Sequence, residues 1–274
     1  MRPDLRSVQT LFSGAHARRW SELYAREVQT PEAHFFRQRR DTVLALLAQR
    51  VPKDRPVVDP GCGAGPVLAA LRAAGWPCTG LDGAPDMLAQ ARGSLAAAGL
   101  SSEELHLGDC RATPFEANRF DAVLCLGVIS YVEDYQPLLA EIQRVLRPGG
   151  LAVVSCRNAA NPVVSDPWRL ATGLARRLLR RIRPEPFTPG RFLDRSVVRV
   201  QLKQAGLVVE REIGIGFGPP RWAGRPLLGD AAAIRLSDAI GRLASRAGLW
   251  PLARRATDIS LWVLHKPAAS GEGA

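Results

Sequence analysis

The chain has 274 residues, of which 46% are hydrophobic and 23% charged, a composition typical of a globular protein with an apolar core. Its net charge of +11 comes from arginine, because Lys53, Lys203 and Lys266 are the only lysines among 37 basic residues. No run of about 18 apolar residues occurs, which excludes a membrane-spanning helix. The five cysteines are scattered and the first residues lack an apolar segment, so we expect a cytoplasmic protein without disulfides, a metal site or a secretory signal.

The first half of the chain predicts a helical segment followed by alternating strands and helices. Residues 1–54 are mostly helical in pattern, and six side chains within 35–50 recur at helical spacing: Phe35, Phe36, Arg39, Val43, Leu46 and Leu47. Strands are expected at 55–60, 77–82, 103–109, 120–127 and 151–156, and helices at 65–75, 84–99 and 135–150. Such alternation indicates βαβ units, and therefore an α/β fold with a parallel sheet covered by helices on both faces.

After residue 157 the alternation is interrupted by two inserts. Residues 158–192 are rich in proline and arginine, a helix (194–206) and a strand (207–214) follow, and a final strand is expected at 258–267. The predicted organisation is a helical cap at 1–54 and one α/β domain at 55–266. That domain carries inserts at 158–192 and 214–256, and a flexible tail follows at 267–274.

Glycine or polar residues stand at the carboxyl ends of four successive predicted strands. These are Asp59 with Gly61, Gly63 and Gly65; Asp82 with Gly83; Asp109 with Cys110; and Leu126 with Gly127. Ligands of open parallel sheets bind beyond these ends, so one ligand touching all four is the simplest interpretation. Glycine lets the backbone approach a ligand closely. Asp82 can accept hydrogen bonds from a ribose diol, and Asp109 from an exocyclic amine such as that of adenine.

Four segments resemble the successive motifs of class I S-adenosylmethionine (SAM)-dependent methyltransferases: VVDPGCGAG, GLDGAPDMLAQAR, GDCRATPF and FDAVLCLGVISYVEDYQPLLAEIQRVLRPGGLAVVS. The most similar subgroup includes ubiquinone and menaquinone biosynthesis enzymes and many natural-product methyltransferases. The resemblance is strong over 35–157 and weak over 193–213 and 258–266. It implies a Rossmann-like sheet of seven strands in the order 3-2-1-4-5-7-6, with strand 7 antiparallel. A dinucleotide-binding protein would more usually show GxGxxG where this chain has GxGxG.

The resemblance implies a SAM site assembled from the strand ends. The glycine loop would pack under the methionine part of SAM, Asp82 would hold the ribose hydroxyls, and Asp109 would bond the adenine N6. The implied cofactor-binding residues are Asp59, Gly61, Cys62, Gly63, Gly65, Asp82, Gly83, Met87, Asp109, Cys110, Arg111, Leu126 and Gly127.

The sequence offers several candidates, but no single clear one, for a base that would activate the methyl acceptor. The candidate catalytic residues are Tyr131, His34 and His16, with Glu133 and Asp134 as alternatives. Many relatives carry a histidine pair where Ser130 and Tyr131 stand. The stretch LGVISYVED lacks the Asn/Asp-Pro-Pro-aromatic motif of methylases that act on amino groups of nucleic acids. Methylases that act at pyrimidine C5 need a cysteine nucleophile after a proline, and Cys78 follows a proline but lies in a predicted strand, which is the wrong place for that nucleophile.

The inserts are strongly basic. Residues 158–203 hold ten basic and three acidic residues, a net +7 of the total +11. An amphipathic helix is predicted there, with arginines covering one side and these apolar residues the other: Trp168, Ala171, Ala175, Leu178 and Ile182. A second such segment is 234–256. The inserts could cover the substrate, dock on an anionic membrane or grip a substrate with a lipid tail or phosphate, or bind RNA. Sparse aromatic residues make nucleic acid the least favoured partner.

These patterns predict a SAM-dependent methyltransferase that acts on a small hydrophobic or amphiphilic molecule in secondary or lipid/quinone-type metabolism. We expect the acceptor atom to be oxygen, ahead of carbon or nitrogen. A SAM-binding scaffold without turnover is the alternative, and RNA methylation is less favoured. The expected partner is a small-molecule acceptor, with peripheral contact between the basic helices and an anionic membrane.

Overall fold

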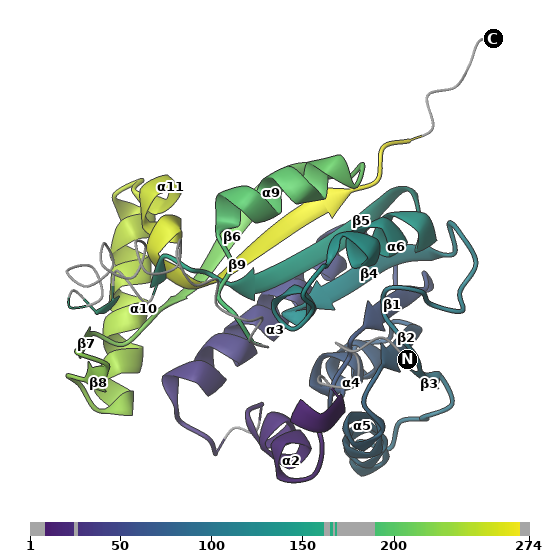
Figure 1. Ribbon diagram of the computed structural model, residues 1–274, viewed down its shortest axis with the longest axis horizontal. Coiled ribbons are helices and arrows are strands. Elements are labelled where there is room, and N and C mark those ends of the chain that lie inside the picture. Colours follow the sequence, from purple (N-terminus) through teal and green to yellow (C-terminus); the bar gives the residue numbers. More distant parts are fainter. Residues whose placement is uncertain (1–8, 25–26, 162–164, 167, 169–189, 269–274) are drawn as a thin grey trace, which may run out of the picture.

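Seven strands form one sheet in the order β3-β2-β1-β4-β5-β9-β6 (Figure 1). The computed structural model describes residues 9–24, 27–161, 165–166, 168 and 190–268. Strands β1 (Val57–Pro60), β2 (Cys78–Asp82), β3 (Leu105–Leu107), β4 (Phe120–Leu126) and β5 (Leu146–Arg157) are parallel. Strand β9 (Thr257–His265) runs antiparallel between β5 and β6 (Val208–Phe217). The predicted fold class and strand order are confirmed.

Helices cover both faces of the sheet because its central strands are apolar on both sides. Val57 and Val58 are consecutive in β1 and point into different cores. One core lies against α3 (Pro31–Arg50), α4 (Pro66–Ala73) and α5 (Pro85–Ala97). The other lies against α6 (Gln136–Val145) and α9 (Arg195–Gln204). This two-sided burial explains the continuous hydrophobic runs in the strand sequences.

Two predicted boundaries are wrong. The helix expected over 135–150 ends at Val145, and β5 begins at the next residue, paired with β4 through Phe120 and Leu146. Pro148 lacks an N–H and cannot continue a helix, yet it is accepted at this end of the strand. Strand β6 continues past the expected end at 214 as far as Phe217, which pairs with Thr257 of β9. The second insert therefore spans 218–256.

The second insert forms a separate group of elements at one end of the molecule (Figure 1). It contains a short hairpin of β7 (Arg221–Trp222) and β8 (Arg225–Pro226), then α10 (Asp230–Arg246), α11 (Trp250–Ala253) and η2 (Arg254–Ala256). The basic helix predicted within 158–192 lies outside the described residues, apart from Trp168 near its start. At the N-terminal side, α2 (Ala15–Glu22) packs against α5.

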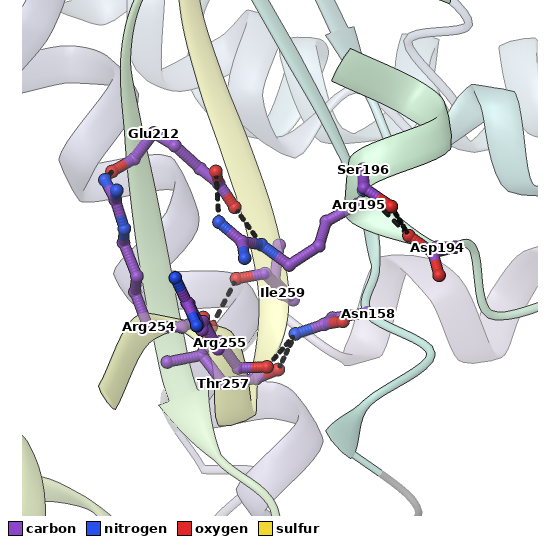
Figure 2. Close-up of polar contacts among 9 residues, drawn as sticks. All are labelled: Asn158, Asp194, Arg195, Ser196, Glu212, Arg254, Arg255, Thr257 and Ile259. Atoms are coloured by element: carbon purple, nitrogen blue, oxygen red, sulfur yellow. Dashed lines mark hydrogen bonds and ion pairs between the residues drawn. The ribbon is translucent and has the colours of Figure 1, made fainter. Parts of the chain in front are cut away.

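Buried hydrogen bonds tie both inserts to the sheet at the point where they leave it (Figure 2). The amide of Asn158, which is fully buried after the end of β5, donates to the carbonyls of Arg255 at 2.9 Å and Thr257 at 3.0 Å. The Thr257 hydroxyl donates to the Arg254 carbonyl at 2.8 Å. The end of β5 and the beginning of β9 are thereby held together, which fixes the position of the second insert relative to the sheet.

Candidate active site

One cavity opens at the carboxyl ends of β1, β2 and β4. Twelve of the thirteen residues predicted to bind the cofactor line it: Asp59, Gly61, Cys62, Gly63, Asp82, Gly83, Met87, Asp109, Cys110, Arg111, Leu126 and Gly127. They come together because the parallel strands deliver their carboxyl ends to one edge of the sheet. Strand-end residues as far apart in the chain as Asp59 and Gly127 therefore meet in one place.

The glycine loop between β1 and α4 leaves no room for a side chain at Gly61 or at Gly65. Gly61 has a φ of 89°, and a Cβ there would lie 2.4 Å from Cγ2 of Val128. Gly65, the thirteenth predicted residue, does not line the cavity. It precedes α4 with a φ of 75°, and a Cβ there would lie 2.9 Å from the Cβ of Ala91 on α5. Gly65 thus lets α4 begin close against α5.

Asp82 holds the glycine loop from the end of β2. One carboxylate oxygen accepts the Gly63 N–H at 2.8 Å and the other accepts the Ala84 N–H at 2.9 Å. Burial raises the pKa of this carboxyl, and the backbone donors oppose that rise. Each carboxylate oxygen has two lone-pair directions, so acceptor capacity remains for ligand hydroxyls.

A buried pair of opposite charges faces the cavity at the end of β1. Asp59 is 3% exposed, and burial raises the pKa of its carboxyl to about 7 while the charge of Arg39 opposes the rise. Arg39, from α3, donates to the Tyr24 hydroxyl at 2.6 Å. Among the described residues, Oδ1 of Asp59 and Nε of Arg39 are buried and have no hydrogen-bond partner. The site therefore offers one acceptor and one cationic donor to a ligand.

Asp109 is bound by the arginine two residues later. Nε and Nη2 of Arg111 donate to its carboxylate at 2.9 and 2.8 Å, and the Arg111 backbone N–H donates to it at 2.9 Å. An adenine amine at this position would therefore meet a carboxylate that Arg111 already orients. Together Asp109 and Arg111 add a hydrogen-bonded pair of opposite charges to the cavity lining.

Aromatic side chains line the cavity on the side of the helical cap. Phe36 of α3 stacks on Trp20 of α2 with ring centroids 5.4 Å apart and on Tyr24 at 5.9 Å. Phe12 contacts Tyr131 edge-on at 4.9 Å. This side of the cavity is suited to an apolar or aromatic molecule.

The three candidate catalytic residues lie in different places. Tyr131 lines the cavity, and burial raises the pKa of its hydroxyl. His34 is not among the cavity residues; its Nε2 lies 3.0 Å from the Asp238 carboxylate of α10 and 3.0 Å from the Gln38 amide. His16 belongs to α2, but its side chain lies outside the described part of the structure.

Arg157 lies beside Tyr131 and adds a charge to the cavity lining at the end of β5. Its Nη2 lies 3.6 Å from the Asp258 carboxylate, and its guanidinium lies over the Phe192 ring at 4.3 Å. Burial raises the pKa of Asp258, and Arg157 opposes that rise. The charge of Arg157 likewise opposes the rise in the pKa of Tyr131, so the guanidinium is close enough to act on groups at this end.

Sequence reasoning missed the part of the site that comes from the cap and the insert roots. These residues are Phe12, Trp20, Phe36, Arg39, Arg157 and Ile259. One signal was present, because Arg39 stands in an otherwise apolar stripe of α3, where a charge must find a buried partner. Within the described residues, no group of three or more His, Cys, Asp or Glu side chains could hold a metal ion. No described helix is long and apolar enough to cross a membrane.

Residues 58–154 match the family model described as a methyltransferase domain. The ubiquinone biosynthesis O-methyltransferase of Methylococcus capsulatus is 27% identical over 210 residues, covering 75% of this chain and 83% of that protein. The malonyl-[acyl-carrier protein] O-methyltransferase of Pseudescherichia vulneris is 31% identical over 149 residues, or 53% of this chain and 57% of that protein. The demethylmenaquinone methyltransferase of Thermus thermophilus is 40% identical over 119 residues, covering 43% of this chain and 52% of that protein. The chain thus spans only about half the length of two of these relatives.

Solved structures share the fold. The magnesium protoporphyrin IX methyltransferase of Synechocystis with bound SAM has a TM-score of 0.62 at 14% identity, covering 97% of this chain and 98% of that one. A methyltransferase of Haloferax volcanii described in complex with its activator has a TM-score of 0.58 at 21% identity, covering 97% of this chain and 100% of that one. Similarity at this level of identity concerns the architecture of the sheet and its helices.

Proposed function

Since the chain belongs to the class I SAM-dependent methyltransferases, we propose that it transfers the methyl group of SAM to an oxygen atom of a small apolar or amphiphilic acceptor. The observation that carries this proposal is the two-part lining of a single cavity. Strand-end residues such as Asp82 and Asp109 make one part polar, and Trp20, Phe36 and Tyr131 make the other aromatic. A nucleoside fits the first part and an apolar acceptor the second.

The charges at the end of β1 match the methionine part of SAM. That part carries an ammonium and a carboxylate. The buried Asp59 Oδ1 can accept from an ammonium, and the buried Nε of Arg39 can donate to a carboxylate. Both residues line the cavity, and neither of the two atoms has a protein hydrogen-bond partner among the described residues. We assign this pair to the amino-acid end of the cofactor, and Asp82 to its ribose.

When bound, SAM supplies an electrophilic methyl group on a positively charged sulfur. The protein then has to align the acceptor oxygen with that methyl group and exclude water. Trp20, Phe36 and Phe12 can do both, because their stacked and tilted contacts form a wall of low polarity in the cavity. Phe12 and Trp20 also pack against the cluster that contains Ala64 and Met87, next to the proposed cofactor site. Their position on α2, α3 and the preceding residues gives the cap a part in binding the acceptor.

The residues near the acceptor favour an oxygen that is already acidic, such as that of a phenol or a carboxylic acid. The Arg157 guanidinium would lower the pKa of such a group and hold its anion, so that little proton removal remains for a base. The Tyr131 hydroxyl is protonated near neutral pH, and burial raises its pKa further, so it can serve as a hydrogen-bond donor that orients the acceptor.

Transfer of a tritiated methyl group from SAM tests the proposal. We expect label in a lipophilic phenol or a fatty acyl carboxylate, and little label in an equally lipophilic amine. Label in the amine alone would contradict the choice of oxygen. Saturable SAM binding with no transfer to any of the three compounds would contradict the proposed methyl transfer. It would favour the alternative, a scaffold that binds SAM without turnover.

A further inference from the structure

Helix α10 in the second insert exposes three of its four larger apolar residues, and the fourth, Ile234, is half-buried. The residues that it buries are small, namely Ala233, Ser237 and Ala244. Leu236, Ile240 and Leu243 follow one another at intervals of four and three residues, so they share one face of the helix, and all three are exposed. Leu243 is 68% exposed. A helix that only covered the substrate would be expected to bury these side chains instead.

Exposed apolar side chains continue on the elements next to α10. Leu249 and Leu252 lie before and within α11, which contacts α10, and Leu252 is 60% exposed. The hairpin of β7 and β8 at the same end of the molecule exposes Trp222, and Leu227 follows it (Figure 1). Scattered single leucines are ordinary on protein surfaces, but three on one face of a helix with more on the neighbouring helix are not. We call Leu236, Ile240, Leu243, Leu249 and Leu252 the leucine surface.

The hairpin is held in place by a buried acid from the first insert. The carboxylate of Asp166, which is 1% exposed, accepts the N–H groups of Ala223 at 3.1 Å and Gly224 at 2.7 Å. The Trp222 ring lies 6.1 Å from that of Trp168. The exposed tryptophan at this tip is therefore carried on an ordered turn.

Arginines border the leucine surface. Residues 218–256 contain seven arginines and two aspartates, a net charge of +5. Arg235, Arg242 and Arg246 lie at intervals of seven and four residues along one flank of α10, and all are exposed. None of the three forms an ion pair within the described residues. Asp238 is turned inward, toward His34 and Gln38 of α3.

We propose that the leucine surface and its arginine flank dock the protein on an anionic lipid bilayer. Apolar side chains in a row with arginines beside them are the pattern of helices that lie in the membrane interface. The charge is complementary to anionic headgroups, and each arginine near such a surface adds to the attraction. The surface lies in the second insert, within the second amphipathic basic segment that the sequence predicts at 234–256.

The position of the insert relates this surface to the cavity. The second insert leaves β6 after Phe217 and rejoins the sheet at Thr257, two residues before the cavity residue Ile259. The first insert begins directly after the cavity residues Cys156 and Arg157. Docking through the second insert would thus bring the acceptor end of the cavity toward the source of an amphiphilic acceptor. This consequence depends on the proposed methyl transfer, whereas the docking itself does not.

Co-sedimentation of the full chain with vesicles tests the docking. Vesicles of phosphatidylcholine alone are compared with vesicles that also contain phosphatidylglycerol, at low and high salt. We expect binding only to the anionic vesicles and weaker binding at high salt. The triple variant Arg235→Glu, Arg242→Glu, Arg246→Glu should weaken binding by roughly 100-fold or more, since each arginine contributes about fivefold. Leu236→Ser with Leu243→Ser should weaken it at both salt concentrations.

A matched control comes from α9, whose Val197 and Val200 are about half exposed, as in the leucine surface. Val197→Ser with Val200→Ser should leave vesicle binding unchanged, and calorimetry with SAM should show that every variant is folded and binds the cofactor. Equal binding of wild type and both surface variants would overturn the proposal, as would equal binding to neutral vesicles. Light scattering provides a further test: a dimer that Leu243→Ser dissociates would assign the surface to a second copy of the chain instead.

Discussion

Arg39 and Asp59 face the same cavity with opposite charges, and each keeps one buried polar atom without a hydrogen-bond partner among the described residues. The guanidinium is close enough to oppose the rise in the pKa of the carboxyl, yet burial still raises that pKa to about 7. A protein interior does not readily hold such a pair unless a ligand completes it. The first three predictions follow from this relationship.

SAM affinity should depend on pH through Asp59. Because burial raises the pKa of this carboxyl to about 7, the anion that would accept from the SAM ammonium is depleted below that pH. We expect affinity to rise between pH 6 and 8 and to level off above the pKa. Calorimetric titrations across this range check it. Asp59→Asn should flatten the profile, and a profile as steep as that of the wild type would contradict the assignment.

The stability of the SAM-free protein should change with pH in the opposite direction to SAM affinity, and fall as the pH rises. A carboxyl with a pKa of about 7 in the folded protein and an ordinary value of 3.8 when unfolded binds its proton more tightly in the folded state. The resulting stabilisation is complete below the unfolded pKa and is lost as the pH rises through 7. Asp59→Asn avoids this loss, so relative to wild type it should gain about 2 to 4 kcal/mol between pH 4.5 and 8. Urea unfolding at both pH values measures the gain, and a constant difference would refute it.

Arg39→Met should weaken SAM binding by roughly 10- to 100-fold, since it removes a charged donor from a buried site. Arg40→Met is the matched control, because Arg40 is the next residue of the same helix but pairs with Asp41 outside the cavity. Calorimetric titration with SAM should show the loss of affinity for Arg39→Met and an unchanged affinity for Arg40→Met. Equal losses would mean that Arg39 acts only through the packing of α3.

Gly61→Ala should destabilise the protein by about 1 to 3 kcal/mol, because the new Cβ would overlap a methyl group of Val128 and the backbone has a positive φ. Adding Val128→Ala should restore part of this loss. Gly63→Ala has a positive φ as well, but its Cβ would meet nothing within 4 Å, so the second substitution should not rescue it. Thermal unfolding of the four variants gives the comparison.

Trp20→Ala should separate binding of the acceptor from binding of the cofactor. The ring lies in the aromatic wall, against Phe36 and Tyr131, and it also packs against the cluster that contains Ala64 of the glycine loop. We expect the KM for an apolar acceptor to rise at least tenfold, as loss of a large aromatic contact implies, and the Kd for SAM to rise by a smaller factor. If the Kd for SAM increased and the KM for the acceptor did not, Trp20 would contribute to binding of the cofactor and not of the acceptor.

The strand-end residues could be predicted because the topology itself brings them together. Once parallel strands alternate with helices, Asp59, Asp82, Asp109 and Gly127 must reach one edge of the sheet. Helical periodicity carries no such guarantee, since it fixes which residues share a face but not what that face meets. His34 therefore stood as a candidate base although its helix turns it toward Asp238.

The contacts of the cap residues Phe12 and Trp20 could not be predicted from a local sequence pattern either. Their contacts with Tyr131 join parts of the chain more than 100 residues apart, and no local pattern records the pairing. The exposure of the leucine surface was also beyond the sequence pattern. Residues 234–256 predicted an amphipathic helix, but only the structure shows that small residues of α10 are the buried ones and that its leucines face outward.

The most direct measurement of the central claim is a calorimetric titration of the full chain with SAM, repeated with Asp82→Ala. The carboxylate of Asp82 holds Gly63 and Ala84 and faces the cavity, so its removal takes away both the shape of the loop and the acceptor for the ribose. We predict saturable binding of one SAM per chain by the wild type and no measurable binding by the variant. Wild-type protein that does not bind SAM, or a variant that binds it equally well, would contradict the assignment of this cavity.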